Sequence, residues 1–138
     1  MRRLFAINSE CPISYTTQLT EKEGITIMKL AMLNCLKSNR VCTGAACLQA
    51  LNERKKSFAQ YKGQNIELTA FMRCNGCDID PEGDKGIIEK MDRLQKIGTE
   101  VLHVGVCTVK KEGGECPTIT KMIEMAQQRG IRVVRGTH

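Results

Sequence analysis

From residue 25 onward the chain alternates between apolar, strand-like runs and amphipathic, helix-like segments. The strand-like runs cover residues 25–33, 66–72, 101–106 and 131–134, and the helix-like segments cover residues 43–61, 84–98 and 117–130. Apolar strands that alternate with helices are typical of a parallel sheet covered on both faces. The pattern therefore predicts an α/β fold: a small flavodoxin-like three-layer domain. Its four-stranded parallel sheet has the order 2-1-3-4 and carries helices on both faces.

Residues 1–24 differ from the rest of the chain. They are polar, lack a clear hydrophobic period and end in Glu21-Lys22-Glu23-Gly24. We interpret residues 1–24 as an N-terminal arm that is dispensable for folding or weakly ordered, and residues 25–138 as a single domain. Cys11 lies in the arm and is expected to belong to no site.

Cysteine is the most informative residue type for function, because the chain has eight Cys but only two His among its 138 residues. No apolar run approaches the ~18 residues of a membrane span. The apolar stretch after Arg3 is too short for a signal peptide. We therefore expect a cytoplasmic protein with no membrane partner. In a reducing compartment, clustered cysteines indicate metal or redox chemistry rather than structural disulfides.

The net charge of +6 does not by itself indicate a nucleic-acid partner. Basic residues are scattered along the chain, and aromatic residues make up only 4% of it. Binding to single-stranded nucleic acid usually combines a basic groove with aromatic side chains on which bases stack. We therefore expect no nucleic-acid partner, and the sequence identifies no protein partner.

The predicted topology brings most of the cysteines to one edge of the sheet. Right-handed crossovers place the carboxyl ends of all four strands on the same edge. The thiols and the imidazole that fall there are Cys35 after the first strand, Cys74 and Cys77 after the second, Cys107 after the third, Cys42 and Cys47 around the start of the first helix, Cys116 before the third helix, and His138 after the fourth strand. This convergence predicts a metal ion as the partner of the domain.

The spacing of the strands limits which thiols can share one ion. Neighbouring strands lie ~4.8 Å apart, so the ends of the second and fourth strands are roughly 14 Å apart. A tetrahedral ion with bonds of ~2.3 Å to sulfur cannot span that gap. The primary ligand set is therefore Cys35, Cys74, Cys77 and Cys107, with Cys42, Cys47, Cys116 and His138 as secondary candidates. Zinc, which we favour, or an iron–sulfur cluster would accept four thiolates.

His103 is a less favoured ligand. It precedes Cys107 by four residues, which is about 13 Å along a regular strand, too far for the two side chains to share an ion. We interpret His103 as a hydrogen-bonded histidine of the core.

Several positive groups are expected to favour thiolates at this edge. Lys37, Arg40 and Arg73 follow or end the first two strands, and nearby cations lower thiol pKa values. The helix starts at Cys47 and Cys116 should act in the same direction through their dipoles.

Several of these stretches together resemble one family. They are Cys42-Thr43-Gly44-Ala45-Ala46-Cys47, Ala50-Leu51-Asn52-Glu53-Arg54-Lys55, Cys74-Asn75-Gly76-Cys77, His103 with Cys107, Cys116-Pro117 and Gly136-Thr137-His138. In this combination residues 28–138 resemble the CGGC-domain family, a prokaryotic metal-binding group without an assigned reaction. Asn75 stands where the naming motif has its first Gly, which should alter the turn more than the ligands.

Two other functions use the same thiols. A thiol redox enzyme could use Cys74 and Cys77 as a dithiol, although Asp78-Ile79-Asp80-Pro81 predicts a loop where such motifs usually have a helix. A phosphatase-like nucleophile at Cys35 with Arg40 is disfavoured, because only four residues separate the pair and the loop lacks glycines that would cradle an oxyanion. The sequence assigns no reaction and does not settle whether the protein is an enzyme.

Overall fold

The computed structural model of the protein describes residues 26–138. The arm expected over residues 1–24 lies outside the described residues, so this domain boundary stays a prediction. The main sheet consists of β1 (Met28–Asn34), β2 (Ile66–Arg73), β3 (Val101–Val104) and β6 (Arg132–Arg135). Its strands are parallel and have the order β2-β1-β3-β6. The predicted α/β class is confirmed, and β6 takes the place of the predicted fourth strand.

The last strand of the main sheet is labelled β6 because a small hairpin precedes it. The hairpin pairs β4 (Val109–Lys110) with β5 (Gly114–Glu115) in an antiparallel arrangement. Sequence analysis missed this hairpin, because two-residue strands are too short to show a hydrophobic period. Two 3-10 helices, η1 (Lys37–Arg40) and η3 (Val106–Thr108), follow β1 and β3.

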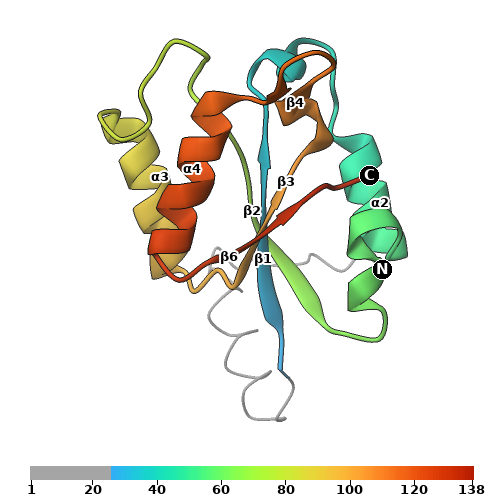
Figure 1. Ribbon diagram of the computed structural model, residues 1–138. Helices are drawn as coiled ribbons and strands as arrows, with labels where there is room; N and C mark the ends of the chain where they lie inside the picture. Colours follow the sequence, from blue (N-terminus) through green and yellow to red (C-terminus); the bar gives the residue numbers. More distant parts are fainter. Residues whose placement is uncertain (1–25) are drawn as a thin grey trace, which may run out of the picture.

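Helices cover both faces of the main sheet, as predicted. Helices α3 (Lys85–Lys96) and α4 (Pro117–Gln128) lie on one face, and α2 (Ala45–Glu53) lies on the other, together with the 3-10 helix η2 (Lys56–Tyr61) (Figure 1). Alternating residues of β1 serve the two faces: Ala31 and Leu33 pack in the cluster under α3 and α4, and Leu30 and Met32 in the cluster under α2 and η2. All four are fully buried, so β1 is the centre of both apolar layers.

The first helix is shorter than the predicted segment 43–61. Helix α2 ends at Glu53, and Arg54 adopts a left-handed conformation with φ 54°. The chain then continues as η2, which buries Phe58 and Tyr61. Their rings lie 4.4 Å and 5.5 Å from the ring of His103, measured between centroids. Packing against β3 thus overrides the local tendency to continue the helix.

The other two helices begin where the sequence predicts. The Asp84 side chain caps α3 by accepting hydrogen bonds from the backbone N–H groups of Gly86 and Ile87. Pro117 occupies the first turn of α4. Among residues 26–138, no helix combines the length and apolarity that crossing a membrane requires.

Candidate metal centre

Backbone N–H groups of the loop after β1 donate hydrogen bonds to two cysteine sulfurs, one from the segment after β2 and one from the segment after β3. The ends of β2, β1 and β3 are nearly level, because Asn34 pairs with Arg73, and Leu33 with Val104. Beyond them the Cys35 N–H donates to Cys107 Sγ at 3.2 Å, and the Leu36 N–H donates to Cys74 Sγ at 3.4 Å. Hydrogen bonds of this kind stabilise negative charge on a sulfur that binds a metal.

Asn34 has an unpaired side-chain oxygen near Gly105 and the Cys107 thiol. Its side chain is buried, and Oδ1 has no hydrogen-bond partner among residues 26–138. A Cβ added to Gly105 would collide with this oxygen and lie 3.2 Å from Cys107 Sγ. A buried acceptor without a partner is costly and needs an explanation. The polar interior at the end of β1 therefore fits a site that receives a ligand.

The turn from Cys74 to Cys77 is tied to α3 through Asn75. Lys90 Nζ donates to Asn75 Oδ1 at 2.7 Å, and Asn75 Nδ2 donates to Asp84 Oδ2 at 3.1 Å. Gly76 has a φ of 127°, which L side chains rarely adopt. The residue that departs from the family motif thus anchors the turn without being a ligand itself.

Cys77 and Cys116 lie at the start of α4. Thr118 Oγ1 donates to the Cys77 carbonyl oxygen at 3.4 Å, and Cys116 occupies the N-cap position. Burial alone would raise the pKa of the Cys116 thiol, but hydrogen bonds from Ile119 and Thr118, together with the charge of Lys110, lower it. This direction agrees with the effect expected for a thiol at a helix start.

Cys47 behaves differently, because it lies inside the first turn of α2 and is only 4% exposed. Burial raises the pKa of its thiol; a hydrogen bond with Thr137 partly offsets this, and the nearby thiols of Cys107 and Cys42 add to the rise. At Cys47 burial thus outweighs the lowering expected from the helix start, and the pKa of the thiol lies above its ordinary value. Its Sγ lies 3.3 Å from Thr137 Oγ1 and 3.4 Å from His138 Nδ1.

In the described part of the chain, no hydrogen bond joins a sulfur to one of the three cations predicted to favour thiolates, Lys37, Arg40 and Arg73. Lys37 and Arg40 lie exposed in η1. The Arg73 guanidinium stacks on Phe71, 5.2 Å from the ring centroid. Their effect on the thiols stays a prediction, whereas Lys110, which sequence analysis did not select, acts on Cys116.

His103 is fully buried and hydrogen-bonded through both ring nitrogens. Its Nδ1 lies 2.9 Å from the Gly136 carbonyl oxygen, and its Nε2 lies 2.7 Å from the Tyr61 hydroxyl. Because a carbonyl can only accept, Nδ1 carries the proton and Nε2 accepts from Tyr61. Burial lowers the pKa of His103; the Gly136 hydrogen bond opposes this effect, and the charge of Arg132 adds to it. His103 thus occupies the core position that its distance from Cys107 indicates.

The lowered pKa of His103 makes stability depend on pH. Between the ordinary pKa of about 6.5 and the lower pKa of the folded state, the unfolded chain protonates this histidine while the folded chain keeps it neutral. The free energy of unfolding should therefore fall as the pH drops below about 6.5 toward the lowered pKa of the folded state, by at most about 1.4 kcal/mol per pH unit. Urea denaturation with a chelator and a reductant would measure this slope. His103→Gln should remove this contribution, and equal slopes in the two proteins would contradict it.

The structure brings the predicted ligands to one edge as separate sulfurs rather than as a formed cage. All seven Cys in the described part of the chain are free thiols. Within residues 26–138 no three His, Cys, Asp or Glu side chains lie close enough to hold one ion. The chemistry of the donors fits a metal that prefers sulfur. Because these thiols lie on or beside loops, binding has to draw them together, as in sites that form on metal binding.

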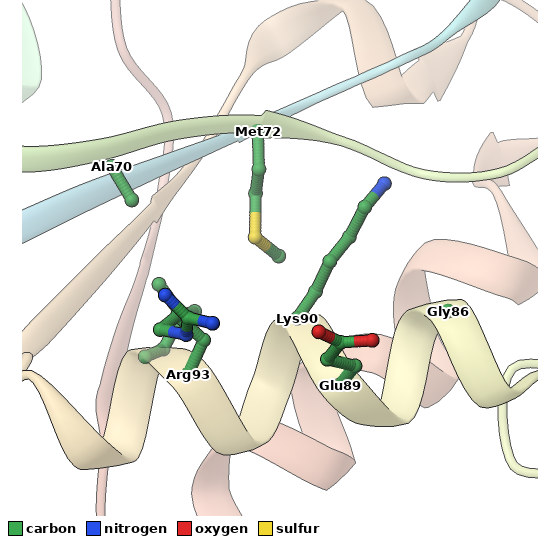
Figure 2. Close-up of a pocket in the computed structure, with 7 residues that line it drawn as sticks. Ala70, Met72, Gly86, Glu89, Lys90 and Arg93 are labelled. Atoms are coloured by element: carbon green, nitrogen blue, oxygen red, sulfur yellow. The ribbon is translucent and has the colours of Figure 1, made fainter.

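A hollow of about 390 Å³ lies elsewhere, between β2 and α3. Figure 2 shows Met72 pointing from the strand toward the helix residues Glu89, Lys90 and Arg93. None of the thiols in residues 26–138 lines this hollow. Moreover, Lys90 is engaged with the Arg73 carbonyl and Asn75. We therefore place the candidate centre at the strand ends and not in this hollow.

Sequence analysis missed the role of Asn34 at this edge and named Thr137 only within the closing stretch Gly136-Thr137-His138. Asn34 ends β1 directly after the apolar run Leu30–Leu33, and a polar residue at that position is a signal that could have indicated its role. Thr137 is fully buried next to Cys47. The contact of Thr137 with Cys47 could not be predicted from neighbouring residues, because it depends on where the chain returns to α2.

The fold and these thiols define a cysteine-rich α/β domain with its candidate centre at the carboxyl edge of a parallel sheet. The CGGC domain model matches residues 29–138. An uncharacterized protein of Methanocaldococcus jannaschii is 31% identical over 122 residues, covering 80% of this chain and 87% of that protein. The chain belongs to the CGGC domain family. No solved structure matches it significantly.

Proposed function

We propose that the protein binds a metal through cysteine thiolates at the carboxyl edge of the main sheet. Cys35, Cys74, Cys77 and Cys107 are the ligands in this proposal, and zinc or an iron–sulfur cluster is the metal. The observation that supports it most is the pair of successive N–H groups after β1, which reach Cys107 Sγ and Cys74 Sγ. The unpaired Asn34 oxygen beside Cys107 adds to it.

In this centre some residues would bind the metal and others would position the ligands. Cys74 directly follows β2 and Cys107 lies in η3 after β3, and backbone donors of the loop after β1 already orient both sulfurs. Asn75 and Lys90 keep the turn that carries Cys74 and Cys77 against α3. A bound zinc ion would cross-link these loops, and a cluster would add the capacity to carry an electron.

The dithiol alternative gains no support from the geometry. The segment between Cys77 and Lys85 contains only turns and irregular structure, so neither Cys74 nor Cys77 begins a helix. A nearby helix start is a common means of activating the attacking thiol of such motifs.

The test is metal analysis and visible absorption of protein purified without oxygen, followed by cobalt titration of the metal-free protein. We expect Cys74→Ala and Cys107→Ala each to weaken cobalt binding at the edge by more than about 100-fold, because each removes a ligand. Cys11→Ala is the matched control and should bind like the wild type. A colourless protein that contains zinc would identify that metal, and a coloured one would identify a cluster.

Unchanged cobalt binding in the Cys74→Ala and Cys107→Ala variants would contradict the proposal. If the two variants fold, as judged by far-UV circular dichroism, and still bind cobalt as the wild type does, the edge thiols are not ligands. The proposal is also contradicted if the wild type contains no metal when purified without oxygen and its metal-free form binds no cobalt.

A further inference from the structure

The start of α2 carries one exposed and one buried cysteine. Cys42 lies exposed on the loop before the helix, and its Sγ accepts a hydrogen bond from the Gly44 N–H at 3.3 Å. Cys47 lies in the first turn of α2 and is only 4% exposed. Gly44 is the N-cap residue of α2, and the three residues from Gly44 to Cys47 correspond to a rise of about 4.5 Å along the helix axis. The two thiols therefore belong to the same helix start.

The end of the chain brings an imidazole and a hydroxyl to the buried thiol. Cys47 Sγ lies 3.4 Å from His138 Nδ1 and 3.3 Å from Thr137 Oγ1. Thr137 is fully buried, and the carbonyl of Gly136 before it accepts a hydrogen bond from His103. In Figure 1 the C-terminus lies beside α2. His138 is thus held next to the Cys47 thiol by a packed segment and not by a frayed end.

We propose that Cys42 and Cys47 form a thiol–disulfide exchange site whose substrate is a disulfide. This pair has the arrangement that Cys74 and Cys77 lack: an exposed thiol just before a helix of nine residues and a buried thiol in the first turn of that helix. The exposed sulfur is open to a substrate from solvent, whereas the buried sulfur is shielded from it. Cys42 is therefore the attacking thiol, Cys47 the resolving thiol and His138 the base that deprotonates Cys47.

The reaction transfers two electrons from the protein to the substrate in two steps. In the first step the Cys42 thiolate attacks one sulfur of a disulfide RSSR, forms the mixed disulfide Cys42–SR, breaks the S–S bond of the substrate and releases RS⁻. In the second step His138 Nδ1 accepts the proton of Cys47, and the Cys47 thiolate attacks the Cys42 sulfur and releases the second RS⁻. The two leaving thiolates take up the protons that Cys42 and Cys47 have lost. The net products are one Cys42–Cys47 disulfide and two RSH.

The surroundings of Cys47 fit a resolving thiol. Burial raises the pKa of this thiol, a hydrogen bond with Thr137 partly offsets the rise, and the nearby Cys107 and Cys42 thiols add to it. Cys47 therefore keeps its proton until a base removes it, and the Thr137 hydroxyl can then donate to the thiolate. The site shares no residue with the four ligands proposed for the edge centre, so it does not depend on metal binding.

The experiment adds one equivalent of bis(2-hydroxyethyl) disulfide to the reduced full chain near neutral pH and maps the products by alkylation and mass spectrometry. We expect a Cys42–Cys47 disulfide as the main product in the wild type and in Cys11→Ser, which is the matched control. Cys47→Ser should stop at the mixed disulfide between Cys42 and the hydroxyethyl thiol, and Cys42→Ser should form neither product. His138→Ala should slow the loss of the mixed disulfide by at least about 10-fold, because the base is removed.

Three results would overturn the exchange site. The proposal is wrong if the first disulfide to form joins any other pair of cysteines, or if Cys42→Ser consumes the reagent as fast as the wild type does. Unchanged loss of the mixed disulfide in His138→Ala would overturn the role of His138 as the base. Cys42→Ser and His138→Ala alter exposed side chains, so their results do not depend on whether the buried Cys47→Ser variant folds. Failure of the exchange site is distinguishable from failure of the edge centre, because cobalt binding tests the edge centre alone.

Discussion

Replacing His103 by alanine should lower the free energy of unfolding by about 3–5 kcal/mol. The side chain is fully buried, and its ring lies 4.4 Å from that of Phe58, measured between centroids. Its removal leaves a cavity and deprives the Tyr61 hydroxyl and the Gly136 carbonyl of their hydrogen-bond partner. The loss should therefore combine packing with two unsatisfied polar groups.

Urea denaturation of the metal-free protein at pH 7 would measure this change. His103→Gln retains a donor and an acceptor and should lose less stability than His103→Ala. Val41→Ala, at a side chain that is 90% exposed, is the control and should change stability by less than about 0.5 kcal/mol. A His103→Ala protein within about 1 kcal/mol of the wild type would show that this network contributes little.

Replacing Gly105 by alanine should affect both stability and metal binding. Gly105 has φ −62° and ψ 148°, a conformation open to any residue, so the effect is steric and not conformational. The new methyl group would collide with Asn34 Oδ1 and press on Cys107 Sγ. We expect a loss of about 1–3 kcal/mol in the free energy of unfolding. Cobalt binding at the edge should weaken by about 10- to 100-fold, because Cys107 is displaced.

Gly113→Ala is the matched control for this substitution. An added Cβ at Gly113 would have only ordinary contacts with Lys110, at 4.0 Å. The control should bind cobalt like the wild type and change stability by less than about 0.5 kcal/mol. If Gly105→Ala binds cobalt as tightly as Gly113→Ala does, Cys107 is not a ligand of the edge centre.

Local patterns were sufficient to predict most of the architecture. The apolar run that forms β1 and the amphipathic segments that form α3 and α4 can be recognised from their own residues. The rule of right-handed crossovers brings the carboxyl ends of the strands to one edge, and the strand order follows that of small flavodoxin-like sheets. For this reason the shared edge of the thiols could be predicted without any knowledge of side-chain contacts.

The break after α2 and the grouping of the thiols depend on contacts between distant residues. Arg54 ends the helix because Phe58 and Tyr61 pack on His103, which is more than forty positions further along the chain. Cys47 meets His138 across 91 positions, and the Cys35 N–H meets Cys107 across 72. Hydrophobic periodicity is a property of neighbours in the sequence, so it predicts elements and their faces. Which thiol meets which partner depends on strand register and on the paths of the loops, and these are set only when the core packs.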